Sequence, residues 1–306
     1  RYGPNLVEKA VLEFSAEDLF APSVRMDLQI DADSLDIVAR SFDSLSVRMT
    51  YSDPRGEMDI FLMRSEDENY QARIAFEDAS AARLLNVDEL SFNFPDERWN
   101  LGGPSRILWD TGGLTFENFR LIRPGLGGLR VGAEGRFPFK GLADLEVVVE
   151  NLDVSRVSHL FRWDESLKGI VDLAFNLTGN DSDPKMVGEI GVNGFQYRDY
   201  FFEELEIEGR YSGKELSGDI GFGDGTEEYL SIVGMIPIDL SIDRVSKRLL
   251  DEEIEVFVTA ASAPFSLLMA PFDSYQEVQG ESSGQVKFGG TLDKLSPEGE
   301  MVLIDG

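Results

Sequence analysis

The residue types that most often perform enzyme chemistry are scarce in this sequence of 306 residues. It contains no Cys and one His, His159, which excludes thiol nucleophiles, thiolate zinc sites, iron–sulfur clusters and metal sites built from several His. A Ser-His-Asp triad would depend on His159 alone, and no Gly-x-Ser-x-Gly nucleophile elbow accompanies it. We therefore interpret His159 as an ordinary residue of a short helix and predict no catalytic residues.

Three segments have compositions that bind phosphate or calcium in other proteins. Residues 125–132 and 221–225 are rich in Gly, but neither precedes a predicted helix or contains the Gly-Lys-Ser/Thr of a phosphate-binding loop. Residues 180–183, Asn-Asp-Ser-Asp, lack the remaining ligands of an EF-hand loop and its closing Glu. We interpret the two Gly-rich segments as hairpin turns and strand glycines and residues 180–183 as a turn, and we predict neither a metal nor a cofactor.

The charge balance narrows the range of partners. Lys and Arg number 28 and Asp and Glu number 57, which gives a formal net charge of −29. This charge disfavours nucleic acid and electrostatic adhesion to anionic headgroups, but it does not disfavour contact with acyl chains. With so many carboxylates, no pair stands out as catalytic. We expect the acidic runs at 66–68, 203–204 and 251–253 to be solvated surface that discourages edge-to-edge aggregation.

Alternation of apolar and polar residues is the dominant pattern along the chain. It is clear at residues 24–32, 45–51, 70–76, 145–149, 171–177 and 205–211, and it is typical of strands with one dry and one wet face. Turn residues between such runs, including Asn193-Gly194, predict hairpins, so we expect an antiparallel meander of the all-β class. Helical spacing is confined to residues 78–85, 154–161 and 244–250.

An internal repeat organises the second half of the sequence. The apolar and Gly pattern of residues 145–179 recurs 111 residues later, at 256–290, without a gap. Upstream, residues 131–138 match 230–237 at an offset of 99, so the second copy contains a 12-residue insertion that includes the predicted helix 244–250. We expect one repeat unit at 99–220 and a second, truncated unit at 221–306, within a longer protein. Residues 1–98 fit either the same sheet or a small separate β-domain.

Two segments of the repeat resemble a known family. Residues 169–179 with 183–194, and residues 284–306, are similar to the characteristic segment of the AsmA-like/TamB family, which includes the inner-membrane component of the translocation and assembly module. The resemblance implies an elongated antiparallel sheet curled into a U-shaped, taco-like hydrophobic groove, built of repeated units with a few short helices. It also implies a periplasmic position in a diderm bacterium, anchored in the inner membrane through segments outside this chain.

The function implied by the resemblance is a lipid conduit that carries phospholipids between the inner and outer membranes. A link to outer-membrane assembly, through a β-barrel assembly protein as partner, is also implied. The expected contacts with the acyl chains come from one face of the repeat strands. These lining residues are Leu145, Val147, Val149, Val171, Leu173, Phe175, Leu177, Ile190, Val192, Leu205, Ile207, Ile220, Phe222, Leu230, Ile232, Ile236, Val256, Val258, Val286 and Phe288.

The alternation alone does not separate a lipid-binding face from a closed core, because both produce the same pattern. The competing hypothesis is therefore a structural or partner-binding β-repeat or sandwich module of the cell envelope. The two hypotheses differ in whether a second layer covers the apolar face around Leu173, Phe175, Val286 and Phe288.

Overall fold

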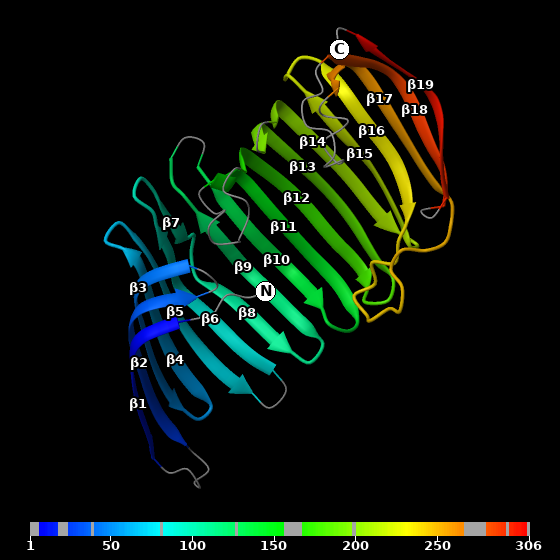
Figure 1. The fold of residues 1–306 in the computed structure, drawn as a ribbon. Coiled ribbons are helices and arrows are strands. Elements are labelled where there is room, and N and C mark those ends of the chain that lie inside the picture. Colours follow the sequence, from blue (N-terminus) through cyan, green and yellow to red (C-terminus); the bar gives the residue numbers. More distant parts are fainter. Residues whose placement is uncertain are drawn as a thin grey trace. The chain divides into compact units, whose positions relative to one another are not determined.

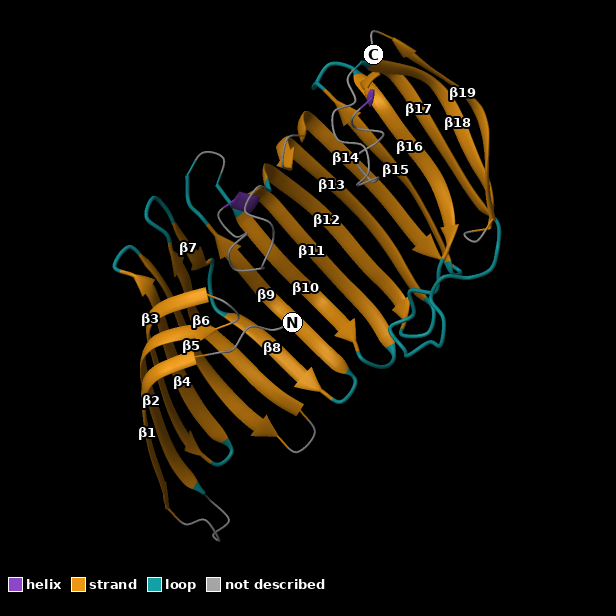
Figure 2. Cartoon of the chain, in the orientation of Figure 1, coloured by secondary structure: helices purple, strands orange, loops and turns teal. Residues whose placement is uncertain are grey.

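The computed structural model describes residues 6–17, 24–37, 40–79, 82–125, 128–155, 167–197, 200–265, 280–291 and 294–304. These residues are all-β: they form nineteen strands, and every strand pairing among them is antiparallel (Figure 2). The chain divides into two units, Arg1–Lys140 and Gly141–Gly306. The predicted fold class and the antiparallel meander are confirmed. The repeat boundaries at residues 98 and 220 stay predictions, and residue 220 lies inside a strand.

Unit 1 contains ten strands that pair in chain order, apart from one interrupted strand (Figure 1). β7 and β8 both lie between β6 and β9, so together they make one course of the sheet, broken at residues 102–104. The strands are β1 (Leu6–Glu17), β2 (Arg25–Ile37), β3 (Arg40–Ser52), β4 (Arg55–Ser65), β5 (Glu68–Ala79), β6 (Ala82–Asn93), β7 (Arg98–Leu101), β8 (Ser105–Asp110), β9 (Gly113–Ile122) and β10 (Arg130–Pro138).

Unit 2 is a meander of nine strands in which each described strand pairs with the next one along the chain. The strands are β11 (Leu142–Asp153), β12 (Lys168–Asn180), β13 (Pro184–Tyr197), β14 (Tyr200–Ser212), β15 (Glu215–Gly223), β16 (Glu228–Pro237), β17 (Ile254–Pro264), β18 (Glu281–Thr291) and β19 (Lys294–Ile304). Successive strands run side by side in Figure 1, from green β11 to red β19.

The sequence repeat is also a repeat of backbone irregularities. Asn151 in β11 and Ser262 in β17, which lie 111 residues apart, both adopt a positive φ, 56° and 58°. Each lies at a bulge in the pairing with the next strand. Each bulge amide donates to a side chain of the neighbouring strand, Asn151 N to Asp172 Oδ1 at 2.8 Å and Ser262 N to Ser283 Oγ at 2.9 Å. The two copies therefore share one local geometry, which two residue types satisfy with different side chains.

Two of the three predicted helices are wrong, and the third lies mostly outside the described residues. The helix at 78–85 is wrong: its described residues, 78–79 and 82–85, belong to β5 and β6, where Asp78 faces Arg83 across the hairpin in an ion pair of 3.3 Å. Residues 244–250 are also wrong. They are irregular, because about two turns cannot sustain a helix alone and Arg248 instead donates to the carbonyls of Asp239 and Ser241. The helix at 154–161 begins at Val154, but its remaining residues from 156 onward lie outside the described residues.

One predicted turn is misplaced. Asn193-Gly194 lies within β13, where the φ of Gly194 is 62° and the pairing with β12 shifts register nearby. Glycine's tolerance of positive φ is used here for a bulge rather than for a hairpin turn. Residues 181–183 connect β12 to β13, and Asp224-Gly225 lies in the connection from β15 to β16, whereas residues 221–223 belong to β15. Asn180 closes its turn by accepting the amides of Ser182 and Asp183.

Candidate functional site

The twenty predicted lining residues share one face of unit 2. The pairing register shows this directly, because residues directly opposite each other on paired strands point to the same side of the sheet. One row crosses eight strands without a polar residue, and we call it the central row. It consists of Val149, Leu173, Ile190, Ile207, Ile220, Ile232, Val258 and Val286.

A second row runs beside the central row and has small residues at its middle. We call it the glycine row; its members are Val147, Phe175, Gly188, Gly209, Gly218, Gly234, Val256 and Phe288. A Cβ added at Gly209 would meet nothing within 4 Å, whereas one at Gly188 would contact the ring of Phe175 at 3.5 Å. The apolar alternation in the sequence predicts the aromatic and aliphatic ends of this row but not its glycines, because glycine has no apolar side chain and so does not contribute to the alternation.

Solvent exposure differs between the middle of the apolar face and its two sides. Six of the twenty residues are buried: Leu145, Val149, Leu177, Val192, Leu205 and Leu230. The other fourteen remain partly exposed, and they include every member of the central row except Val149. The apolar face is therefore sealed along its two sides and accessible in the middle.

The segment of residues 238–250, which we call the strap, covers one of these sides. Ile238 N donates to the carbonyl of Lys214, Leu240 N to Tyr211 Oη and Ile242 N to the carbonyl of Asp181, at 2.8–2.9 Å. These contacts attach the strap to the turns that follow β12 and β14. Below it, Leu177 and Tyr211 are each only 2 % exposed.

A buried carboxylate fixes the strap. Asp239 is 4 % exposed, and its carboxylate accepts Lys214 Nζ at 2.9 Å together with the amide and hydroxyl of Ser241. Hydrogen bonds from Ser241, and then the bond from Lys214, lower the pKa of Asp239 to about 2. The carboxylate is therefore ionised at neutral pH and keeps both partners.

Aromatic rings cover the other side of the face. Phe202 packs between Phe195 and Phe222, with ring centroids 5.8 Å and 5.2 Å apart. Leu230 and Ala263 complete this cluster and are almost fully buried. The aromatic cluster and the strap thus bound the central row and the glycine row at opposite ends of the strands.

The opposite face of unit 2 is acidic. Glu189, Glu208 and Asp219 lie directly opposite one another on β13, β14 and β15. A hollow of about 340 Å³ involves Glu189 and Glu208, and most of its lining residues belong to this acidic face, including the small Ala174 and Gly191. The electrostatic contrast between the two faces matches the predicted division into a wet side and a dry side.

The described strands of unit 2 all belong to one sheet. Among the described residues, every member of the central row except Val149 is partly exposed, whereas a second sheet in a sandwich would hide such a row.

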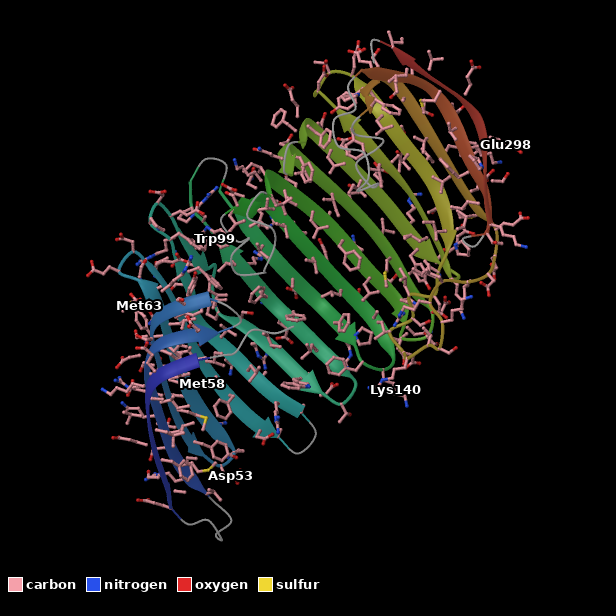
Figure 3. The ribbon with its side chains drawn as sticks, in the orientation of Figure 1. Asp53, Met58, Met63, Trp99, Lys140 and Glu298 are labelled. Carbon is pink, nitrogen blue, oxygen red and sulfur yellow. The ribbon has the colours of Figure 1, made fainter. Side chains whose placement is uncertain are left out.

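Unit 1 has an apolar face of its own. Tyr70, Phe92 and Phe94 gather near Trp99. Trp99 is 4 % exposed, packs on Phe94 at 4.9 Å between centroids, and donates its indole N–H to Glu97. Figure 3 labels Trp99 and Asp53 at opposite ends of the strands of this unit. At the far edge, Leu12 and Phe14 on β1 are 66 % and 58 % exposed, so this face stays open up to its edge strand.

One member of the acidic run at 66–68 differs from the predicted solvated surface, whereas Glu66 and Asp67 are exposed. Glu68 is buried, at 9 % exposure, and its carboxylate accepts two hydrogen bonds from Arg64, of 2.9 and 3.1 Å, which compensate for the loss of water. The i,i+4 spacing of Arg64 and Glu68 is the sequence signal that could have identified this pair, since the two residues flank a hairpin turn.

His159, the one residue considered for a catalytic triad, lies outside the described part of the chain. Among the described residues, no three His, Asp or Glu side chains are grouped so that they could hold a metal ion. The described residues also include no helix with the length and apolar composition of a membrane span.

Comparisons of the chain with protein-family models, with curated proteins and with solved structures give no match. The residues and geometry of the apolar face are consequently the basis for inferring a function.

Proposed function

We propose that the chain is a non-enzymatic lipid-binding protein whose unit 2 holds acyl chains on the central row and the glycine row. The observation that supports this most directly is the continuity of the apolar central row across eight strands, partly exposed on all of them except β11. At a strand spacing of about 4.8 Å, these rows extend roughly 34 Å, comparable to the ~30 Å of hydrocarbon in a bilayer. That length accommodates about two acyl chains placed end to end.

The energetic basis of binding is the removal of both apolar surfaces from water. Each acyl methylene transferred from water gains about 0.8 kcal/mol. Because the strap and the aromatic cluster close the two sides, an acyl chain lies across the strands rather than along them. The acidic face remains in water, which keeps the loaded protein soluble.

The family resemblance extends this proposal to the cell. On that basis, the chain would be a periplasmic part of an inner-membrane-anchored conduit that carries phospholipids toward the outer membrane. A curled groove, an outer-membrane β-barrel partner and a link to outer-membrane assembly belong to the same proposal.

The test combines binding and transfer. The chain is incubated with phosphatidylcholine vesicles and examined by native mass spectrometry, and transfer of a fluorescent phospholipid between donor and acceptor vesicles is followed. We expect bound phospholipid and faster transfer than in buffer. Replacing Phe175 and Phe288 by Glu should abolish both effects, because each substitution places a charge on the apolar face.

The matched control changes the acidic face by the same charge. Val187 and Val233 are 44 % exposed on that face, so Val187→Glu/Val233→Glu should leave binding and transfer intact. Lack of bound phospholipid, together with equal transfer by the two double variants, would favour the structural or partner-binding alternative.

A further inference from the structure

The strap belongs to a connection between strands that is longer than the equivalent connection in the first copy of the repeat. β10 ends at Pro138 and β11 begins at Leu142, so three residues connect them. In the second copy β16 ends at Pro237 and β17 begins at Ile254, so sixteen residues make the equivalent connection. Because the short connection suffices for the first pair of strands, the additional residues have another role.

The contacts that hold the strap are mainly polar. Its amides donate to the turn carbonyls of Lys214 and Asp181 and to the hydroxyl of Tyr211 on β14. Ser241 Oγ also donates to the carbonyl of Ser182 at 3.0 Å, and Asp239 forms an ion pair with Lys214. Its apolar side chains contribute less, since Leu249 is 46 % exposed and Ile238, Leu240 and Ile242 are partly exposed. A segment with few buried apolar contacts opens at a lower free energy than the strands beneath it.

The surface below the strap continues the apolar face. Tyr211 and Gly209 lie on the same side of β14, and Leu177 and Phe175 have the same relation on β12. Leu145 and Leu177 face each other across β11 and β12. Opening of the strap would therefore expose a row of large apolar side chains next to the glycine row. Contact of these side chains with water is unfavourable.

We propose that the strap is an internal cover of the apolar face, which opens when an acyl chain occupies the row that includes Leu145, Leu177 and Tyr211. This inference rests on the proposed lipid-binding function and specifies how that site is regulated. In water the closed state is favoured because it hides this row. An acyl chain hides the same row in the open state, so it binds the open state better and shifts the population toward it.

The first experiment examines the strap without any lipid. Hydrogen exchange is measured by mass spectrometry for peptides of the strap and of β14. We expect the strap amides to exchange faster than those of β14, and faster still in Lys214→Met, which removes the ion pair to Asp239. Lys247→Met is the matched control, because Lys247 lies on the strap but pairs with the exposed Asp251. Strap amides as slow as those of β14 in all three proteins would overturn the proposal.

The second experiment locks the strap. The natural chain has no Cys, so Ser182→Cys/Ser241→Cys introduces one disulfide between residues already in contact. The fluorescent fatty acid cis-parinaric acid is the probe. We expect the oxidised protein to take up the probe about tenfold more slowly than the same protein after reduction, consistent with an open state populated at the 0.1–10 % level.

Equal uptake rates before and after reduction, with normal uptake by the parent chain, would overturn the cover. If the parent chain takes up no fatty acid, the lipid-binding proposal fails, and the hydrogen-exchange result alone decides whether the strap opens.

Discussion

Filling the glycine row at Gly209 offers a sharp test of where acyl chains lie. An added Cβ at this position meets no atom within 4 Å, and its φ is not in the left-handed region. Gly209→Ile therefore inserts a branched side chain into the middle of the proposed lipid-binding surface, with no clash at its Cβ. In a strand, this replacement should also raise stability by about 0.5–1 kcal/mol, because glycine costs more conformational entropy and Ile favours the extended backbone.

The size of the effect follows from the spacing of the strands. An extended chain advances about 1.2 Å per bond, as the 3.3–3.6 Å rise over the three bonds of a residue implies. One strand spacing of about 4.8 Å therefore corresponds to about four methylenes. Displacing these methylenes from the face costs about 3 kcal/mol at 0.8 kcal/mol each, or roughly a hundredfold in Kd.

The assay is titration with cis-parinaric acid, accompanied by urea unfolding to confirm that the variant folds. Gly191→Ile is the control, since Gly191 lies on the neighbouring strand β13 but faces the acidic side, and an added Cβ there also meets nothing within 4 Å. We expect the Kd to rise only in Gly209→Ile, while both variants are at least as stable as the parent chain. A folded Gly209→Ile protein with unchanged Kd would show that acyl chains do not cross the glycine row.

Three other measurements test separate parts of the structure. Leu177→Ala should lower the free energy of unfolding by about 2–5 kcal/mol, because its side chain is 2 % exposed, whereas Leu142→Ala, at 75 % exposure, should change it by less than about 0.5 kcal/mol in the same urea titration. Glu208→Gln should raise stability by about 0.2–1 kcal/mol by relieving like-charge contacts with its cross-strand neighbours, and this gain should shrink in 1 M salt, where the screening length is about 3 Å; an equal gain at high salt would exclude repulsion as its cause. The lowered pKa of Asp239, about 2, means that its stabilising contribution is present above the ordinary value of about 3.9 and is lost as the pH falls from there toward 2. The protection of the strap amides, relative to their intrinsic exchange rate at each pH, should fall over that pH range in the parent chain but not in Asp239→Asn. Identical pH profiles of protection would show that this carboxylate does not hold the strap.

The strand content could be predicted from the sequence because alternation is a local property. A residue pair such as Leu173 and Phe175 lies on one face of any strand, whatever that strand pairs with. The repeat was equally accessible, since the offset of 111 residues preserved the glycines and bulge positions of the two copies. Short helical spacing was less informative, although residues 78–85 and 244–250 satisfied it. The described part of 78–85 pairs as a hairpin, and Arg248 donates to the carbonyls of Asp239 and Ser241.

The amino-acid sequence by itself determined that this protein has strands with one apolar and one acidic face, arranged in a repeated antiparallel order. Only the tertiary structure decided which part of the apolar face remains accessible. Exposure depends on what lies above a side chain, and the strap and the aromatic cluster come from segments distant in the sequence from many of the residues they cover. Leu177 and Ile190 have the same apolar character, but Leu177 is buried near the strap whereas Ile190 stays partly exposed in the central row.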